Sequence, residues 1–286
     1  MNIAPDLLAL DHLTVADTTP SQLIALAAEV GSPAVCLFLE PMAVLPRMPE
    51  FRLLGDTPER RETRHRCEGL GIHIDLAYPF TLTARTQVQA FRRAMETAAW
   101  LGVRALNTLH YDRDPQRRID LFAAFCELAA EYGLRVAVEF YPLSQIRSLP
   151  EALDLVARIE RPGQVGVNID LLHLMRSGGR IEDIRNAPPG SISYAQFCDG
   201  PQSLDTPAWS TEASYQRQLP GEGQFDVAGF SSALPAGVPC SVEVPQELQI
   251  AQGQSARERG MRALQATRSV IAMAAASQTA LERQAI

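Results

Sequence analysis

Four oxygen-bearing side chains lie at the ends of four successive strand-like segments in the second half of the chain: Glu139, Asp170, Gln196 and Glu243. In each segment the residue two positions earlier is small or polar, as Asn168 is before Asp170. Because side chains alternate faces along a strand, all four should point into the interior of a closed sheet. Converging carboxylates cannot all stay ionised at close range without a cation, so this pattern predicts a bound divalent metal.

The types of ligand indicate which metal to expect. Two glutamates, an aspartate and an amide oxygen are hard donors, which suit Mg²⁺ or Mn²⁺. Zinc prefers imidazole or thiolate, and the five histidines of the chain form no cluster in the sequence. Glu139 and Glu243 would face each other across the metal and exchange a proton with a substrate, which makes both candidate catalytic residues.

Further polar residues are expected near these ligands. His173 follows Asp170 by three residues, within reach of the metal, and is a candidate acid/base and substrate-binding group. Arg217 lies on a long loop, from which an arginine can bind an anionic group with two hydrogen bonds. The remaining candidates for the substrate pocket or its support are Asn107, His12 and Asp199.

The elements that position these residues alternate regularly. Helical stretches with apolar residues at three- and four-residue spacing separate eight strand-like segments: 7–15, 34–40, 73–80, 105–111, 135–142, 165–173, 192–200 and 239–245. This alternation predicts parallel strands in an α/β fold, a (β/α)8 TIM barrel forming a single domain over residues 1–286. An open doubly wound sheet is the alternative, but no G-x-G-x-x-G follows the first segment.

Two long connections interrupt the short-loop pattern, at residues 41–57 and 200–226. Both would lie on the barrel face that carries active sites in this fold, where long loops act as lids or binding elements. The tail from about residue 277 is expected to fray or to pack against a partner chain.

Composition excludes several classes of function. The net charge is -7, which argues against nucleic-acid or membrane-surface binding. All 26 basic residues are arginine, so chemistry that requires a lysine, such as a Schiff base or a P-loop, is excluded. The start of the chain does not read as a secretory signal and the five cysteines are scattered, so we expect a cytoplasmic protein with reduced thiols.

The ordered strand-end motifs VEFYP, NIDLLH, AQFCDG and VEVP, together with Arg217 before LPGEG, resemble those of the sugar phosphate isomerase/epimerase family. That family has the xylose isomerase-like TIM barrel. The resemblance implies one divalent metal ion at Glu139, Asp170, Gln196 and Glu243. Many members have histidine where this chain has Gln196, and glutamine there is more similar to the dehydroshikimate dehydratases. The histidine-rich zinc set of the AP endonucleases in this superfamily is missing.

We therefore expect a metal-dependent isomerase or epimerase that acts on a polyhydroxylated, sugar-like carbonyl compound through a metal-stabilised enediolate. The first alternative is a metal-dependent dehydratase of the 3-dehydroshikimate or inosose type, in which His173 would protonate the departing hydroxyl. The second is a non-catalytic or partner-dependent barrel. The expected partner is a small molecule, with neither nucleic acid nor membrane, and a homodimer is an open alternative to a monomer.

Overall fold

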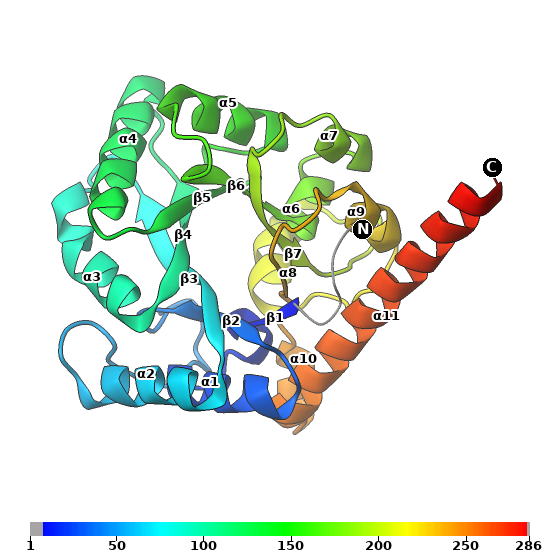
Figure 1. Cartoon of the computed structure of the whole chain (residues 1–286), viewed down its shortest axis with the longest axis horizontal. Helices are drawn as coiled ribbons and strands as arrows, with labels where there is room; N and C mark the ends of the chain where they lie inside the picture. Colours follow the sequence, from blue (N-terminus) through cyan, green and yellow to red (C-terminus); the bar gives the residue numbers. More distant parts are fainter. Residues whose placement is uncertain (1–7, 285–286) are drawn as a thin grey trace.

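Eight parallel strands form a closed barrel in sequential order, which confirms the predicted (β/α)8 fold (Figure 1). The computed structural model describes residues 8–284, and the environments of side chains up to residue 276. The strands are β1 (Leu8–Asp11), β2 (Ala34–Phe38), β3 (His73–Leu82), β4 (Val103–His110), β5 (Arg135–Glu139), β6 (Val165–Asp170), β7 (Ile192–Phe197) and β8 (Cys240–Val242). β8 pairs with β1 and closes the ring.

Helices surround the barrel (Figure 1). They are α1 (Pro20–Glu29), α2 (Pro58–Leu70), α3 (Arg92–Leu101), α4 (Pro115–Glu131), α5 (Leu149–Ile159), α6 (Leu171–Arg176), α7 (Ile181–Arg185), α8 (Trp209–Tyr215), α9 (Val227–Ala233), α10 (Glu247–Ala251) and α11 (Ala256–Gln284). The described residues also form three short 3-10 turns: η2 (His12–Val15), η3 (Val88–Phe91) and η4 (Thr206–Ala208).

Local signals in the sequence set several helix ends. The side chains of Thr57 and Asp114 accept hydrogen bonds from backbone amides in the first turns of α2 and α4, and a proline follows each of them. Gly71 ends α2 in the left-handed conformation that glycine adopts without strain. The N-caps therefore set where α2 and α4 begin, and Gly71 ends α2 two residues before β3 begins.

The main core lies between the barrel and its helices. Val136 and Val138 of β5 are buried, and Phe80 of β3 makes edge-to-face contacts with Phe91 and Phe125 under α4. A fully buried phenylalanine contributes about 1.5–3 kcal/mol. This packing leaves the opposite strand face free to carry polar groups into the barrel.

Seven of the eight strands end one to four residues earlier than the sequence predicted, and the ends of β1 and β6 bear on the site. β1 stops at Asp11 and β6 stops at Asp170, whereas segments 7–15 and 165–173 were expected to be strands; Leu7 lies outside the described residues. In each case the aspartate side chain accepts a hydrogen bond from the amide two residues later and caps a helical turn. His12 therefore lies on η2 and His173 on α6, not on strands.

The C-terminal helix α11 crosses the outside of the barrel and extends beyond it (Figure 1). Its backbone is helical through Gln284, across the segment from about residue 277 where a frayed tail was expected; the side chains of that segment lie outside the description. Among the described residues, no helix is both long enough and apolar enough to cross a membrane.

Candidate metal centre and active site

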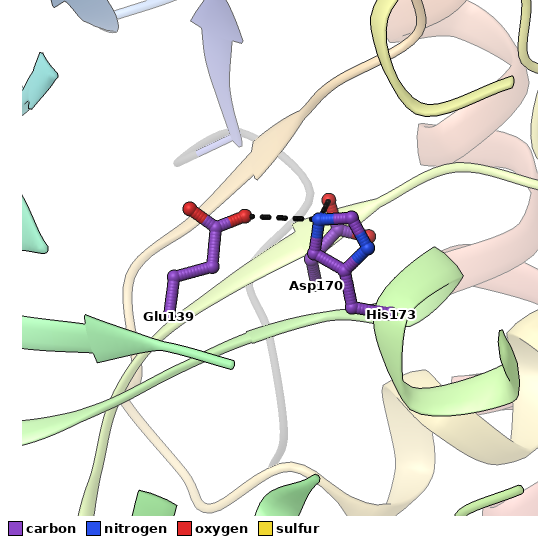
Figure 2. Close-up of side chains that lie close together, drawn as sticks. All are labelled: Glu139, Asp170 and His173. Atoms are coloured by element: carbon purple, nitrogen blue, oxygen red, sulfur yellow. Dashed lines mark ion pairs between the residues drawn. The ribbon is translucent and has the colours of Figure 1, made fainter. Parts of the chain in front are cut away.

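Glu139, Asp170 and His173 converge at the carboxyl-terminal mouth of the barrel (Figure 2). One potential ligand atom from each residue lies within 4.8 Å of the others. His173 Nε2 is 3.3 Å from Glu139 Oε1 and 3.9 Å from Asp170 Oδ2. All three side chains are buried. Glu139 ends β5, Asp170 ends β6, and the immediate start of α6 brings His173 back over both carboxylates.

Arg217 joins two of the expected metal ligands. Its Nη1 lies 2.7 Å from Asp170 Oδ2 and 2.8 Å from Glu243 Oε2. Its Nε and Nη2 both donate to the backbone carbonyl of Ala213, which fixes the guanidinium in place. We expected this arginine on a lid, but it is buried and faces the carboxylates. The residue comes from the long connection after β7, which returns to the barrel mouth here.

Burial and neighbouring charges shift the pKa values of Asp170 and Glu243 in opposite directions. Burial acts to raise the pKa of Asp170, but the positive charge of Arg217, followed by that of His173, holds it well below its usual range. Burial raises the pKa of Glu243 well above its ordinary value, and the neighbouring Asp11 and Asp170 carboxylates raise it further against the effect of Arg217. Several acids thus share one arginine, and ionisation of all of them would leave an excess of negative charge.

Gln196 is held in a chain of buried hydrogen bonds. Its Nε2 donates to Asp11 Oδ2 over 3.3 Å, and its Oε1 accepts from Asn168 Nδ2 over 2.5 Å. Asn168 Nδ2 also donates to Asn107 Oδ1 over 3.2 Å, and Asn107 Nδ2 donates to Glu139 Oε2. Asn107 was expected near the substrate; it both lines the cavity and contacts Glu139.

A cavity of about 320 Å³ opens above these residues. Glu139, His173, Arg217 and Glu243 line its polar side. The other walls are mainly apolar or aromatic, and include Phe38, Met42, Tyr78, Phe80, Tyr111 and Tyr141. The Tyr141 ring lies 4.7 Å from the His173 ring between centroids. The cavity is therefore a small, largely apolar chamber with acid/base groups on one side.

His12 and Asp199, the other two residues predicted for the substrate pocket or its support, make contacts within the fold and do not line the cavity. His12 is fully buried, its Nε2 contacts the Thr18 carbonyl, and its Nδ1 accepts from the Phe38 amide. Burial lowers the pKa of His12 to about 4, although the Thr18 contact opposes this, and the residue does not line the cavity. Asp199 accepts from the amides of Gly200, Gly221 and Phe225, and so organises the loop that follows Arg217.

Three residues that contact the site were not predicted from the sequence as site residues: Asp11, Asn168 and Tyr141. Asp11 accepts from the Tyr78 hydroxyl and from Gln196, which brings the first strand into the site. The sequence indicated Asn168 only as a polar neighbour of Asp170. Its spacing of two residues from Asp170, which places both side chains on the inward face of the strand, was the signal that could have identified it. No periodic signal pointed to Tyr141, because it follows the end of β5.

The donor set fits a divalent cation. Glu139, Asp170 and His173 already offer two carboxylates and an imidazole close together. Glu243 Oε2 is buried and has no hydrogen-bond partner among the described residues, although it lies 2.8 Å from Arg217 Nη1. A cation held by Glu139, Asp170, Gln196 and Glu243 would offset the excess negative charge.

Comparison with known proteins identifies the family of the chain. The model of the family described as "Xylose isomerase-like TIM barrel" matches residues 19–267. The chain belongs to this family. Two 3-dehydroshikimate dehydratases, from Pseudomonas aeruginosa and Pseudomonas putida, are each 28% identical to it, over 81% and 78% of this chain. These alignments cover 37% and 35% of the relatives, so the chain spans about a third of their length.

Solved structures show the same fold. A xylose isomerase-like TIM barrel/4-hydroxyphenylpyruvate dioxygenase fusion protein aligns with a TM-score of 0.72 and 23% identity, over 90% of this chain and 41% of that one. The IOLI protein, solved with a bound zinc atom, aligns with a TM-score of 0.73 and 18% identity, over 96% of this chain and 99% of that one.

Proposed function

We propose that the protein is a divalent-metal-dependent dehydratase that removes water β to a ketone in a small cyclic hydroxyketone carrying a carboxylate, of the 3-dehydroshikimate type. The observation that carries this function is the convergence of Glu139, Asp170 and His173 beside the cavity. The choice of dehydration over isomerisation, which the sequence slightly favoured, is supported by the two dehydratases that are 28% identical to the chain.

Each site residue has a role in this reaction. Glu139, Asp170, Gln196 and Glu243 would hold the cation, and Mg²⁺ or Mn²⁺ suits these donors. When bound, the cation polarises the ketone oxygen and makes the adjacent C–H bond more acidic. A glutamate carboxylate, Glu139 or Glu243, removes that proton.

His173 completes the elimination. The electron pair of the broken C–H bond forms the new double bond as the β C–O bond breaks, and His173 donates the proton that turns the departing hydroxyl into water. The 3.3 Å contact between His173 Nε2 and Glu139 Oε1 supports transfer of the abstracted proton back to the imidazole. One proton thus moves from carbon to water through two side chains.

The cavity lining supports this substrate class. Among the described residues that line it, Arg217 is the only arginine, and its Nη1 is already engaged by two carboxylates. This favours a substrate with one carboxylate over a phosphorylated sugar, which usually needs several cationic or backbone donors. The aromatic wall that includes Tyr111 and Tyr141 suits the apolar face of a six-membered ring.

An isomerase or epimerase is the second candidate, because Glu139 and Glu243 both line the cavity and could serve opposite faces of one carbon. In either case we propose that the protein works in the cytoplasm, as a monomer or homodimer, on a small molecule. Its five cysteines are free and buried, which suits a reducing compartment.

The test is to incubate the Mn²⁺-loaded protein with 3-dehydroshikimate and to record the ultraviolet absorbance of the aromatic product, 3,4-dihydroxybenzoate. We expect product formation that stops in chelator and in a Glu139→Gln variant. Absence of product from metal-loaded protein would contradict dehydration of this substrate. Deuterium uptake by a ketose in D₂O, in the same preparation, would instead support the isomerase.

A further inference from the structure

Asn168 lies beneath the site, at the centre of a network that reaches β1, β4, β5 and β7. It is on β6, two residues before Asp170, and is fully buried. Its single amide nitrogen donates both to Gln196 Oε1 on β7 and to Asn107 Oδ1 on β4. Its own Oδ1 has no hydrogen-bond partner among the described residues. The side chain therefore acts here only as a donor.

The first branch fixes the orientation of the Gln196 amide. Asp11 Oδ1 accepts from the Tyr78 hydroxyl and the Leu13 amide, which leaves Oδ2 to accept from Gln196 Nε2. The amide nitrogen must therefore point toward Asp11, and the oxygen toward Asn168. A cation can bind only the amide oxygen, and that oxygen has a second lone pair free for this purpose.

The second branch fixes Glu139. Because Asn107 Oδ1 is occupied by Asn168, the Asn107 amide nitrogen is turned toward Glu139 Oε2. The other carboxylate oxygen, Oε1, is then left facing His173. One donor thus determines the orientation of an amide on β7 and, through Asn107, of a carboxylate on β5.

We propose that Asn168 is a positioning residue that aligns Gln196 and Glu139 for cation binding without itself contacting the cation. This inference rests on the metal site of the proposed function. It gives an inward-facing asparagine below the ligands a specific role: a donor at this position orients the Gln196 amide and, through Asn107, leaves Glu139 Oε1 facing His173.

The discriminating change is Asn168→Asp, which keeps the size of the side chain but replaces the donor with an acceptor. The carboxylate would face Gln196 Oε1 and Asn107 Oδ1 and turn both amides away from their present orientation. We expect Mn²⁺ affinity to fall about 10- to 100-fold, as is typical when partners of metal ligands are lost. If residue 168 affected the site only through its charge, the Mn²⁺ affinity of Asn168→Asp should instead increase, because one more negative charge near the site should tighten cation binding.

The measurement is the dissociation constant of Mn²⁺, from the electron paramagnetic resonance signal of free Mn²⁺ titrated into the metal-free protein. Asn186→Asp is the matched control, since Asn186 is exposed at the end of α7 and should leave the affinity unchanged. Asn168→Ala, which removes the donor without adding charge, should also weaken binding. Thermal melting in chelator identifies the variants that remain folded.

Affinity in Asn168→Asp or Asn168→Ala equal to or tighter than that of the wild type would overturn the positioning role. If Asn168→Asp does not fold, the result for Asn168→Ala decides alone, and failure of both variants to fold would assign Asn168 to stability instead. Absence of Mn²⁺ binding to the wild-type protein would contradict the metal site of the proposed function, which is a different outcome.

Discussion

Replacement of Arg217 by methionine should destabilise the metal-free protein strongly. The substitution keeps most of the apolar volume but removes a guanidinium that lies 2.7 Å from Asp170 and 2.8 Å from Glu243. All three groups are buried, so water cannot replace the lost charge. Loss of one partner of a buried ion pair costs about 3–5 kcal/mol. Single domains are stable by about 5–15 kcal/mol, so the variant should still fold.

The assay is urea unfolding, followed by circular dichroism, in chelator and in saturating Mn²⁺. In chelator the free energy of unfolding should fall by about 3–5 kcal/mol relative to the wild type. Mn²⁺ should narrow this difference, because a cation at the carboxylates replaces the lost positive charge and should therefore bind the variant more tightly than the wild type, and tighter binding adds more stability at a given Mn²⁺ concentration.

Arg158→Met is the matched control for this experiment. Arg158 pairs with Asp154 one helical turn away on α5, with about half of its side chain exposed, and such pairs contribute only about 0.3–0.5 kcal/mol. An Arg217→Met protein that unfolds within about 1 kcal/mol of the wild type in chelator would refute the reasoning, because the two carboxylates would then not depend on the arginine.

Three further predictions follow from the structure. His173→Asn should lower kcat for the dehydration about 100-fold or more, because the proton donor is lost, and a rate within tenfold of the wild type would contradict this role. Gly223→Ala should destabilise the protein by about 1–3 kcal/mol in urea unfolding, because the added Cβ would lie 2.2 Å from the Asp199 carboxylate; unchanged stability would show that this loop adapts freely. Burial lowers the pKa of His12 to about 4 and the pKa of His110 to about 3, both below the unfolded value of 6.5. The unfolded chain therefore binds more protons than the folded protein at acid pH. Each of the two residues should lower the free energy of unfolding by about 3 kcal/mol between pH 7 and pH 4. Nuclear magnetic resonance should find two histidine rings that do not titrate above pH 5, and titration of all rings near pH 6.5 would contradict their burial.

The sequence was sufficient to predict the barrel because strand and helix periodicities alternate eight times without a break. Inward parity then placed Glu139 and Asp170 correctly on the same face of neighbouring strands. These inferences need only local geometry, since side chains alternate between the two faces of a strand.

The remaining features depend on contacts between distant segments. The position of Arg217 follows from the path of the connection after β7, which carries it 47 residues along the chain from Asp170 to form an ion pair. The end of β1 at Asp11 and of β6 at Asp170 depends on caps formed by the side chains, which moved His12 into a buried turn and His173 over the carboxylates. Hydrophobic periodicity carries no information on such polar contacts.

The network around Asn168 shows the same limit. Parity indicated that Asn168 faces inward, but only the register of β6 between β5 and β7 brings its amide to Gln196. The sequence therefore indicated which residues enter the barrel, and the three-dimensional arrangement determined which of them contact each other.

The most direct test of a metal centre at the barrel mouth is anomalous diffraction from crystals grown with Mn²⁺. The account predicts one strong manganese peak per chain, in contact with Glu139 and Asp170 and absent from an Asp170→Asn variant. Lack of a peak in the wild-type protein, or a peak that persists unchanged in the variant, would contradict it.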